Sequence, residues 1–447
     1  MTTPSLSLSR RSIWKLSYPV MVAGLSQSLL MLTDTAFLGR LGQVELAAGG
    51  MANLWYFLLV IVSLGLGSGL QVMVGRRLGE GNLQAVGSVV NHGLLLSLFF
   101  SLLTFVILYW LMPIFLQDYL QSRAIYLNTV AYLDIRVWDL PIVFFTILMR
   151  GFYTGVGHNQ IIVWSTLLTA VSNFVLNWFL VLGLAGFPAM GVAGSALSTV
   201  IAQALGGLLV LVHVYRAGYV QRYGLFRREA LDSGLLRRLM ALSGPTMLQY
   251  LLSMGGFLYL AYEIEKLGET ALAASELVKT AYLTLMIPSW GFQAAASTLV
   301  SYVIGAGHPA AVGRLAWRIA LQSLWAALGL SLFLFAFPRL TFQLYTSDPA
   351  LIQQAIGPGY MVGIGLLLFS IGGIYLNAVI GTGATRFALA AELGTITAYC
   401  LTIYLLRVYS PGLMAYWSAE LAYMGGMVLT TWLYLRSKRW MRLRAAV

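Results

Sequence analysis

The sequence repeats itself at an offset of 226 residues. The matched pairs include Leu41 and Leu267, Gly65 and Gly291, Gly79 and Gly305, and Pro19 and Pro245. The register holds without a gap from residue 16 to residue 157. Self-similarity over this length predicts that the chain contains two copies of one structural unit.

Composition indicates the environment in which these copies fold. Of the 447 residues, 59% are hydrophobic and only 9% are charged, and the mean hydropathy is +0.81. Soluble proteins carry about 25% charged residues, so this chain cannot cover a water-facing surface and belongs in a lipid bilayer. Segments of about 20 mostly apolar residues can span a bilayer as helices. Twelve qualify, at approximately 13–38, 45–75, 86–115, 124–153, 160–184, 191–215, 240–264, 271–303, 314–337, 353–380, 386–407 and 413–436.

The twelve segments predict an all-α integral membrane fold, because a membrane barrel would show shorter segments of alternating polarity. One long polar gap joins the copies. We therefore expect an N-lobe at 1–216, a cytoplasmic linker at 217–238 and a C-lobe at 239–447. Six spans per lobe is an even number, so both lobes enter the membrane in the same direction. Their pseudo-two-fold axis then runs along the membrane normal.

The basic residues predict the orientation. With the N-terminus inside, 20 of the 27 Lys and Arg residues lie on the inner side and 5 on the outer side, while Arg136 and Lys279 fall within spans. Basic residues favour cytoplasmic loops, so both termini are expected in the cytoplasm, with the chain in a bacterial-type inner (plasma) membrane. The formal charge of +12 does not indicate a nucleic-acid partner, because the basic residues lie between apolar spans.

Ionisable side chains inside spans are the first candidates for function, since each costs about 2.5–3.5 kcal/mol on insertion scales. Asp34 lies in the outer half of the first span, with no basic residue within one helical turn. A proton or cation relieves the cost of burying a carboxylate, so we interpret Asp34 as a proton or sodium site. The alternative is a helix-end carboxylate that faces water near Arg40.

Polar residues in spans 4 and 5 allow two interpretations. Asn173 and Asn177 are four residues apart and share one helix face, where they either join a polar cavity with Asp34 or bond neighbouring helices. For Asp134, Arg136 and Asp139 of span 4 we favour a structural ion pair or a water-accessible helix end.

The second half carries fewer candidates. Glu276 and Lys279, three residues apart, form either a second coupling site or a structural salt bridge. Glu263 is interpreted as a residue at the membrane rim, and Glu392 falls within span 11. Pro19, inside the first helix, removes a backbone donor and can kink that helix.

Other functional classes find little support. Gly65-Leu66-Gly67-Ser68-Gly69 lies in an apolar helix with no preceding strand, which excludes a dinucleotide-binding loop and favours close helix packing. The four histidines are scattered, and no nucleophile–base pair or phosphate-binding lysine loop is present. We therefore predict that the chain is not an enzyme and binds no cofactor. A channel is disfavoured because polar residues are rare in the spans.

The segment Thr33-Asp34-Thr35-Ala36-Phe37-Leu38-Gly39-Arg40-Leu41-Gly42, followed by Leu46-Ala47-Ala48, resembles the first helix of multidrug and toxic compound extrusion (MATE) transporters, most closely their DinF-type branch. Similar matches are Gly191-Val192-Ala193-Gly194-Ser195-Ala196, Arg150-Gly151-Phe152-x-x-Gly155-x-Gly157 and Leu272-Ala273-Ala274. The resemblance covers nearly the whole chain.

The resemblance implies two six-helix lobes around a central cleft and an acidic residue of the first span, here Asp34, that couples to the ion. In the DinF-type branch an asparagine and an aspartate on the fifth helix complete the N-lobe pocket. They correspond to Asn173 and Asn177, so an amide replaces the second acid. Ser195 is included in this pocket. In other branches acidic residues of helices 7 and 8 contribute, a part that Glu276 would take here.

The resemblance further implies a monomeric secondary antiporter that exports cationic or amphiphilic organic compounds in exchange for H+ or Na+ by rocker-switch alternating access. The alternative is a flippase for lipid-linked substrates or a polysaccharide exporter of the same superfamily. The offset of 226 residues carries Asp34, Asn173 and Asn177 onto Leu260, Tyr399 and Ile403. None of these counterparts carries a charge at neutral pH, so the N-terminal half is predicted to hold the ion site.

Overall fold

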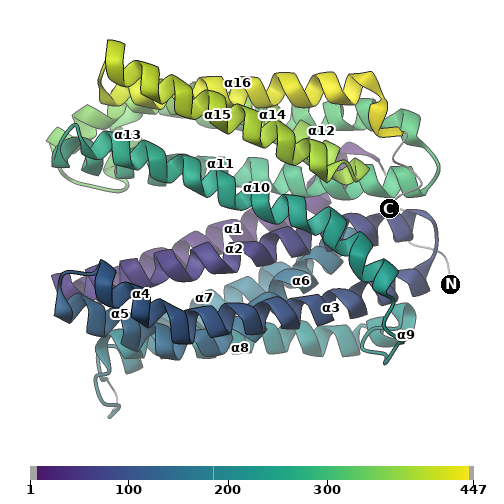
Figure 1. The fold of residues 1–447 in the computed structure, drawn as a ribbon, viewed down its shortest axis with the longest axis horizontal. Helices are drawn as coiled ribbons and strands as arrows, with labels where there is room; N and C mark the ends of the chain where they lie inside the picture. The colour runs from purple at the N-terminus through teal and green to yellow at the C-terminus, as the bar shows by residue number, and fades with distance from the viewer. Residues whose placement is uncertain (1–7, 185, 442–447) are drawn as a thin grey trace. The chain divides into compact units, whose positions relative to one another are not determined.

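The computed structural model of the chain describes residues 8–184 and 186–441, and these residues form helices without any strand (Figure 1). Each of the twelve predicted spans falls on a long helical segment. Ten are single helices: α1 (Arg10–Leu41), α2 (Gln43–Gly79), α7 (Gln160–Leu180), α8 (Gly191–Arg216), α10 (Ser233–Glu265), α11 (Glu269–Gly305), α12 (Val312–Ala336), α14 (Pro349–Thr382), α15 (Thr385–Tyr409) and α16 (Leu413–Ser437).

Two predicted spans change helix type along their length. The third consists of α3 (Leu83–Val106), a π-helical turn η1 (Ile107–Leu111) and α4 (Met112–Tyr119). The fourth consists of α5 (Arg123–Arg136), a 3-10 turn η2 (Val137–Asp139) and α6 (Leu140–Val156). Three short helices lie in connections: α9 (Tyr219–Tyr223), η3 (Pro309–Ala311) and α13 (Pro338–Gln343).

Eight helical segments are long and apolar enough to cross a membrane on length and composition alone. They are α1, α2, the segment 83–119, α7, α8, the segment 309–336, α14 and α15. The other four predicted spans lie on the interrupted segment 123–156 and on α10, α11 and α16, which carry more charged or aromatic side chains. The described part of the chain is therefore a multi-pass helical membrane protein.

The chain divides into two compact units. Residues Val22–Val74 and Asn82–Met240 form the N-terminal unit. The C-terminal unit contains the described residues up to Met21, the segment Gly75–Gly81 and the described residues from Ala241 onward. Three helices, α1, α2 and α10, thus contribute residues to both units. The lobe boundaries at residues 216 and 239 stay a prediction.

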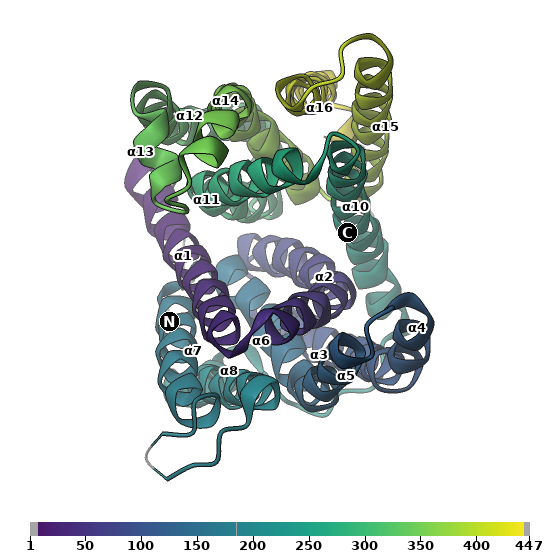
Figure 2. The same cartoon turned by 90° about the vertical axis from the view of Figure 1, so that its left-hand side faces the viewer.

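Each unit has its own apolar core. In the N-terminal unit, Leu38, Tyr132 and Phe144 belong to a buried cluster that brings together α1, α2, η1, α5, α6 and α8. Figure 2 shows the helices of this unit nearly end-on, with α7 beside α8. In the C-terminal unit, Tyr282 and Trp417 belong to a buried cluster supplied by α10–α12 and α13–α16. These cores surround the polar groups described below.

The segment after α9 is fixed to α3 within the N-terminal unit. The Asn91 amide donates to the Gly224 carbonyl at 3.0 Å, and its oxygen accepts from the Phe226 amide at 2.8 Å. The Asp232 amide donates to His92 Nε2 at 3.0 Å, so that nitrogen is unprotonated and His92 Nδ1 donates to the Ser88 carbonyl. The second half of the predicted linker is therefore held by side chains of α3, and α10 begins at Ser233.

Glycine allows α2 and α6 to approach closely. A Cβ atom on Gly67 would lie 3.1 Å from the Ile147 carbonyl oxygen, and one on Gly151 would collide with the Gly67 backbone. The glycines of this part of α2 thus serve helix packing, as small residues do in membrane bundles.

The Gly151→Ala substitution tests this contact. We expect a loss of about 1–3 kcal/mol of stability, because overpacking a tight interface displaces backbone or side chains. Thermal unfolding of the purified protein in detergent measures the loss as a lower midpoint. Gly50→Ala is the matched control, since a Cβ there meets no atom within 4 Å. Equal midpoints for the two variants would contradict the packing argument.

Candidate functional site

Asp34 lies on α1 inside the N-terminal unit, where only 5% of its surface is exposed. Its carboxylate accepts a hydrogen bond from Asn177 Nδ2 at 2.8 Å and a longer one from Thr199 Oγ1 at 3.4 Å. Asn177 is on α7 and Thr199 is on α8. Three helices therefore converge on one buried carboxylate. This geometry differs from a helix-end residue that faces water beside Arg40.

The two asparagines extend this network. The second hydrogen of the Asn177 amide is donated to Asn173 Oδ1 at 3.1 Å, and Asn173 Nδ2 donates to Thr199 Oγ1 at 3.0 Å. Both asparagines are fully buried. Because they are four residues apart on α7, both amides face Asp34 and α8. The structure thus brings Asp34, Asn173 and Asn177 into one cluster.

Residues of α8 complete the network. Ser198 Oγ donates to Asn177 Oδ1. Ser198 and Thr199 were not among the residues expected from sequence, although they follow Ser195 by one helical turn. Ser195 itself is buried, and its hydroxyl has no hydrogen-bond partner in the described part of the chain. Its carbonyl accepts from Ser198 and Thr199 at 2.9 Å, so Ser195 touches the network through its backbone.

A second buried group lies at the end of α5. Arg136 forms an ion pair with Asp139 and stacks over the Tyr56 ring, 4.4 Å from its centroid. Tyr56 donates to Asp139 Oδ1 at 2.5 Å. These contacts agree with a structural ion pair in span 4, and Asp134 is exposed. Arg136 is also within electrostatic range of Asp34, so its positive charge favours the ionised carboxylate.

The acidic candidates of the C-terminal unit occupy different positions. Glu276 and Lys279 pair with each other at 2.5 Å on an accessible face of α11. Glu263 is buried and pairs with Lys266 at 2.8 Å and with Arg407 at 3.5 Å.

Two further carboxylates, Glu392 on α15 and Glu420 on α16, are also buried. Sequence reasoning noted Glu392 without giving it a role and did not weigh Glu420. Their positions inside apolar spans were the signal that would have identified them.

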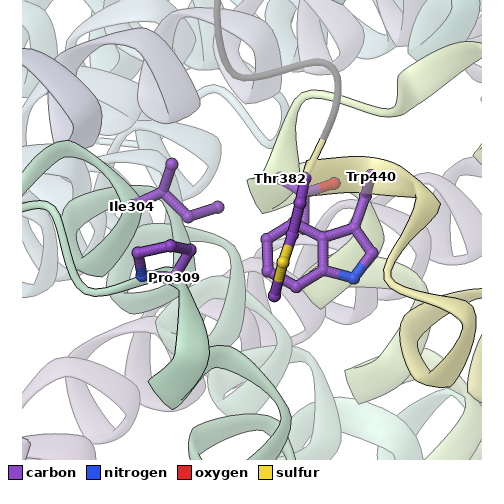
Figure 3. A pocket seen from close by; sticks show the side chains of 5 residues that line it. Ile304, Pro309, Thr382 and Trp440 are labelled. Carbon is purple, nitrogen blue, oxygen red and sulfur yellow. The ribbon is translucent and has the colours of Figure 1, made fainter.

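Open space in the units is limited. A cavity of about 50 Å3 in the N-terminal unit is lined by residues of α1, α6, α7 and α8, among them Gln27, Arg150, Thr166, Thr169 and Gln203. A water needs about 10–15 Å3 by this measure, so the cavity has room for a few. A second cavity, bordered by Ile304, Pro309, Thr382 and Trp440, has about 10 Å3 and is too small for an organic compound (Figure 3).

The Asn177→Ala substitution tests the Asp34 network. We expect a loss of about 1–3 kcal/mol, because the buried Asp34 and Asn173 oxygens each lose a donor. Thermal unfolding in detergent gives the measurement. The control is Asn128→Ala, since Asn128 is exposed on α5 and bonds only its own helix at Ala124. If Asn177→Ala unfolds at the same temperature as Asn128→Ala, the network does not stabilise the fold.

Comparison with known proteins places the chain in a family. The family model described as MatE matches residues 19–179 and 245–404. The two matched ranges begin at Pro19 and Pro245, which are the paired prolines of the internal repeat. Together they cover more than half of the chain.

Individual relatives agree. The chain is 26% identical over 420 residues to the probable multidrug resistance protein NorM of Synechocystis, covering 90% of this chain and 88% of the relative. It is 27% identical over 390 residues to the probable NorM of Thermotoga maritima, covering 84% and 81%. The fold matches a solved outward-facing MATE transporter of the MOP superfamily with a TM-score of 0.91, at 18% identity, over 100% and 99% of the two chains.

These findings confirm the predicted helical membrane fold. They also confirm that the chain is not an enzyme, because its relatives are named as transporters. The assignment to the DinF-type branch stays a prediction. The chain belongs to the MatE family, the multidrug and toxic compound extrusion family that its motifs resemble.

Proposed function

We propose that this protein is a secondary antiporter that exports cationic or amphiphilic organic compounds in exchange for protons. The observation that carries the proposal is the buried Asp34 carboxylate with its donors on α7 and α8. The names of the relatives support the substrate class, since two are called multidrug resistance proteins. The substrates are small molecules, and no cofactor takes part beyond the coupling ion.

The exchange follows from the two states of Asp34. When it is ionised, its negative charge favours a positively charged compound in the same unit. A proton neutralises the carboxylate and removes that attraction, so the proton and the cation compete. A ligand shifts a conformational equilibrium only through its different affinity for the two states. Protonation supplies such a difference, because it changes the hydrogen bonds that join α1 to α7 and α8.

The contacts of Asp34 favour a proton over Na+. A sodium ion requires several oxygen lone pairs around it, as hard cations do in general. The groups that contact Asp34 are donors: the Asn177 amide NH2 and the Thr199 hydroxyl. The oxygens of Asn173 and Asn177 are already occupied by Asn177 and Ser198. A carboxylate surrounded by donors can accept a proton without rebuilding its site.

Pro19 is proposed as the point at which α1 responds. It lacks a backbone N–H and so removes one helical hydrogen bond. Two residues later, between Met21 and Val22, α1 passes from the C-terminal to the N-terminal unit. A bend at Pro19 would let the Asp34 segment of α1 move with the N-terminal unit. Rocker-switch alternating access then follows, with lobes at 1–216 and 239–447 joined by the linker 217–238.

The proposed setting is a bacterial-type inner membrane, with a monomer whose two termini face the cytoplasm. The 20 to 5 distribution of basic residues supports this orientation. Ser195 belongs to the proposed N-lobe pocket through its position beside Ser198 and Thr199. Glu276 and Lys279, which neutralise each other at an accessible position, are proposed as a structural pair.

Asp34→Asn tests the coupling role. Reconstituted into proteoliposomes with an imposed pH gradient, the variant should lose proton-driven efflux of a fluorescent organic cation, because asparagine cannot exchange a proton. Asp118→Asn, which changes an exposed carboxylate of α4, should transport like the parent. Efflux by Asp34→Asn at the parent rate would refute the role of Asp34.

The choice of ion is tested with separate gradients. An inward proton gradient without sodium should drive efflux of the organic cation, whereas an inward sodium gradient at equal pH should not. The reason is that donors rather than oxygen ligands surround Asp34. The same liposomes with a protonophore serve as the control. Efflux driven by sodium alone would show that the coupling ion is Na+.

A further inference from the structure

The internal repeat relates a polar place in one unit to a carboxylate in the other. The offset of 226 residues carries Ser253 of α10 onto Gln27 of α1, and Glu392 of α15 onto Thr166 of α7. Gln27 and Thr166 both line the 50 Å3 cavity of the N-terminal unit. In the C-terminal unit the corresponding helices bring Ser253 and Glu392 into direct contact.

Glu392 is held by three side chains from two neighbouring helices. Its Oε1 accepts from Ser253 Oγ at 2.6 Å and from Tyr423 OH at 2.5 Å, and its Oε2 accepts from Gln249 Nε2 at 3.3 Å. Ser253 and Gln249 are on α10, and Tyr423 is on α16. Only 1% of the Glu392 surface is exposed. The carboxyl group is thus enclosed and oriented.

No positive charge balances this group. The titratable side chains that interact with Glu392 are Tyr250 of α10 and Glu420 and Tyr423 of α16. Among the described residues, no Lys, Arg or His forms an ion pair or hydrogen bond with Glu392 or Glu420. Glu420 accepts from Tyr282 of α11 at 3.1 Å. Two uncompensated negative charges in one apolar bundle are costly, and binding a proton relieves that cost.

The hydroxyl of Ser253 fits both protonation states of Glu392. It lies 2.6 Å from Glu392 Oε1 and 3.1 Å from the Gln249 carbonyl oxygen. With Glu392 ionised, Ser253 donates to the carboxylate. With Glu392 protonated, the acid donates to Ser253 Oγ, and Ser253 turns its hydrogen to the Gln249 carbonyl. A hydroxyl can donate and accept in this way, so a proton enters or leaves without moving a helix.

We propose that Glu392 is a second proton-binding site of this transporter, located in the C-terminal unit and separate from Asp34. The ligand is a proton rather than a metal ion, because the contacts of Glu392 are donors and the described residues hold no group of three His, Cys, Asp or Glu able to bind a metal. The role of this proton in transport rests on the proposed proton antiport. The binding of the proton does not.

Infrared difference spectroscopy of the purified full-length protein between acidic and alkaline pH tests the site. We expect a protonated-carboxyl C=O band that is absent in Glu392→Gln and retained in Asp34→Asn and Glu420→Gln. Glu276→Gln is the matched control, because Glu276 is an accessible glutamate of the same unit, paired with Lys279. A pH difference spectrum of Glu392→Gln identical to that of the parent would overturn the proposal.

Two variants keep the glutamate and test its surroundings in case Glu392→Gln does not fold. Ser253→Ala and Tyr423→Phe each remove one hydroxyl from Glu392 Oε1. Each should shift the frequency of the Glu392 band, since that frequency depends on the hydrogen bonds of the acid. A band unchanged in both variants would place the exchanging proton elsewhere and refute the assignment.

Proteoliposome transport separates this proposal from the proposed function. Glu392→Gln should move fewer protons per exported molecule than the parent, while efflux still depends on Asp34. An unchanged ratio would refute a role of Glu392 in transport. If proton-driven efflux is absent in the parent, the proposed antiport fails, whereas the infrared band of Glu392 remains as predicted.

Discussion

The free energy of holding a carboxylate inside an apolar helix bundle determines how this structure is built. In the N-terminal unit Asp34 is accommodated by amide and hydroxyl donors from α7 and α8, with Arg136 within electrostatic range. The donors must stay aligned, so α1, α7 and α8 are held in one register. Any event that changes the charge of Asp34 changes the contacts among three helices at once.

Much of this organisation could be predicted from the sequence. Span positions follow from apolar length, and the repeat predicted two related units. Asp34, Asn173 and Asn177 were identified as candidates because polar groups are rare in spans. Ser198 and Thr199 were missed, since hydroxyl residues are common in helices and bond their own backbone. Only the packing of α7 against α8 selects the ones that face Asp34.

The asymmetry expected between the halves needs a different description. The counterparts of Asp34, Asn173 and Asn177 are uncharged, as their sequence predicts, yet the C-terminal unit has buried carboxylates at other positions. Tyr399, the counterpart of Asn173, lies against the Tyr423 ring that borders Glu392, with centroids 5.7 Å apart. Alignment by repeat register compares single positions, whereas charge in a bundle can move by one turn or to the next helix and remain in the same interior.

The attachment of residues 224–232 to α3 has a mechanical consequence. Residues up to Met240 belong to the N-terminal unit, including the first turns of α10. The connection between the units therefore contains no slack coil, and α10 itself continues across the boundary. Stiffness along α10 is lowest where Pro245 leaves a helical carbonyl unpaired. A stiff rod with one compliant point transmits rotation and little translation, so the covalent path restricts the units to a few directions of movement.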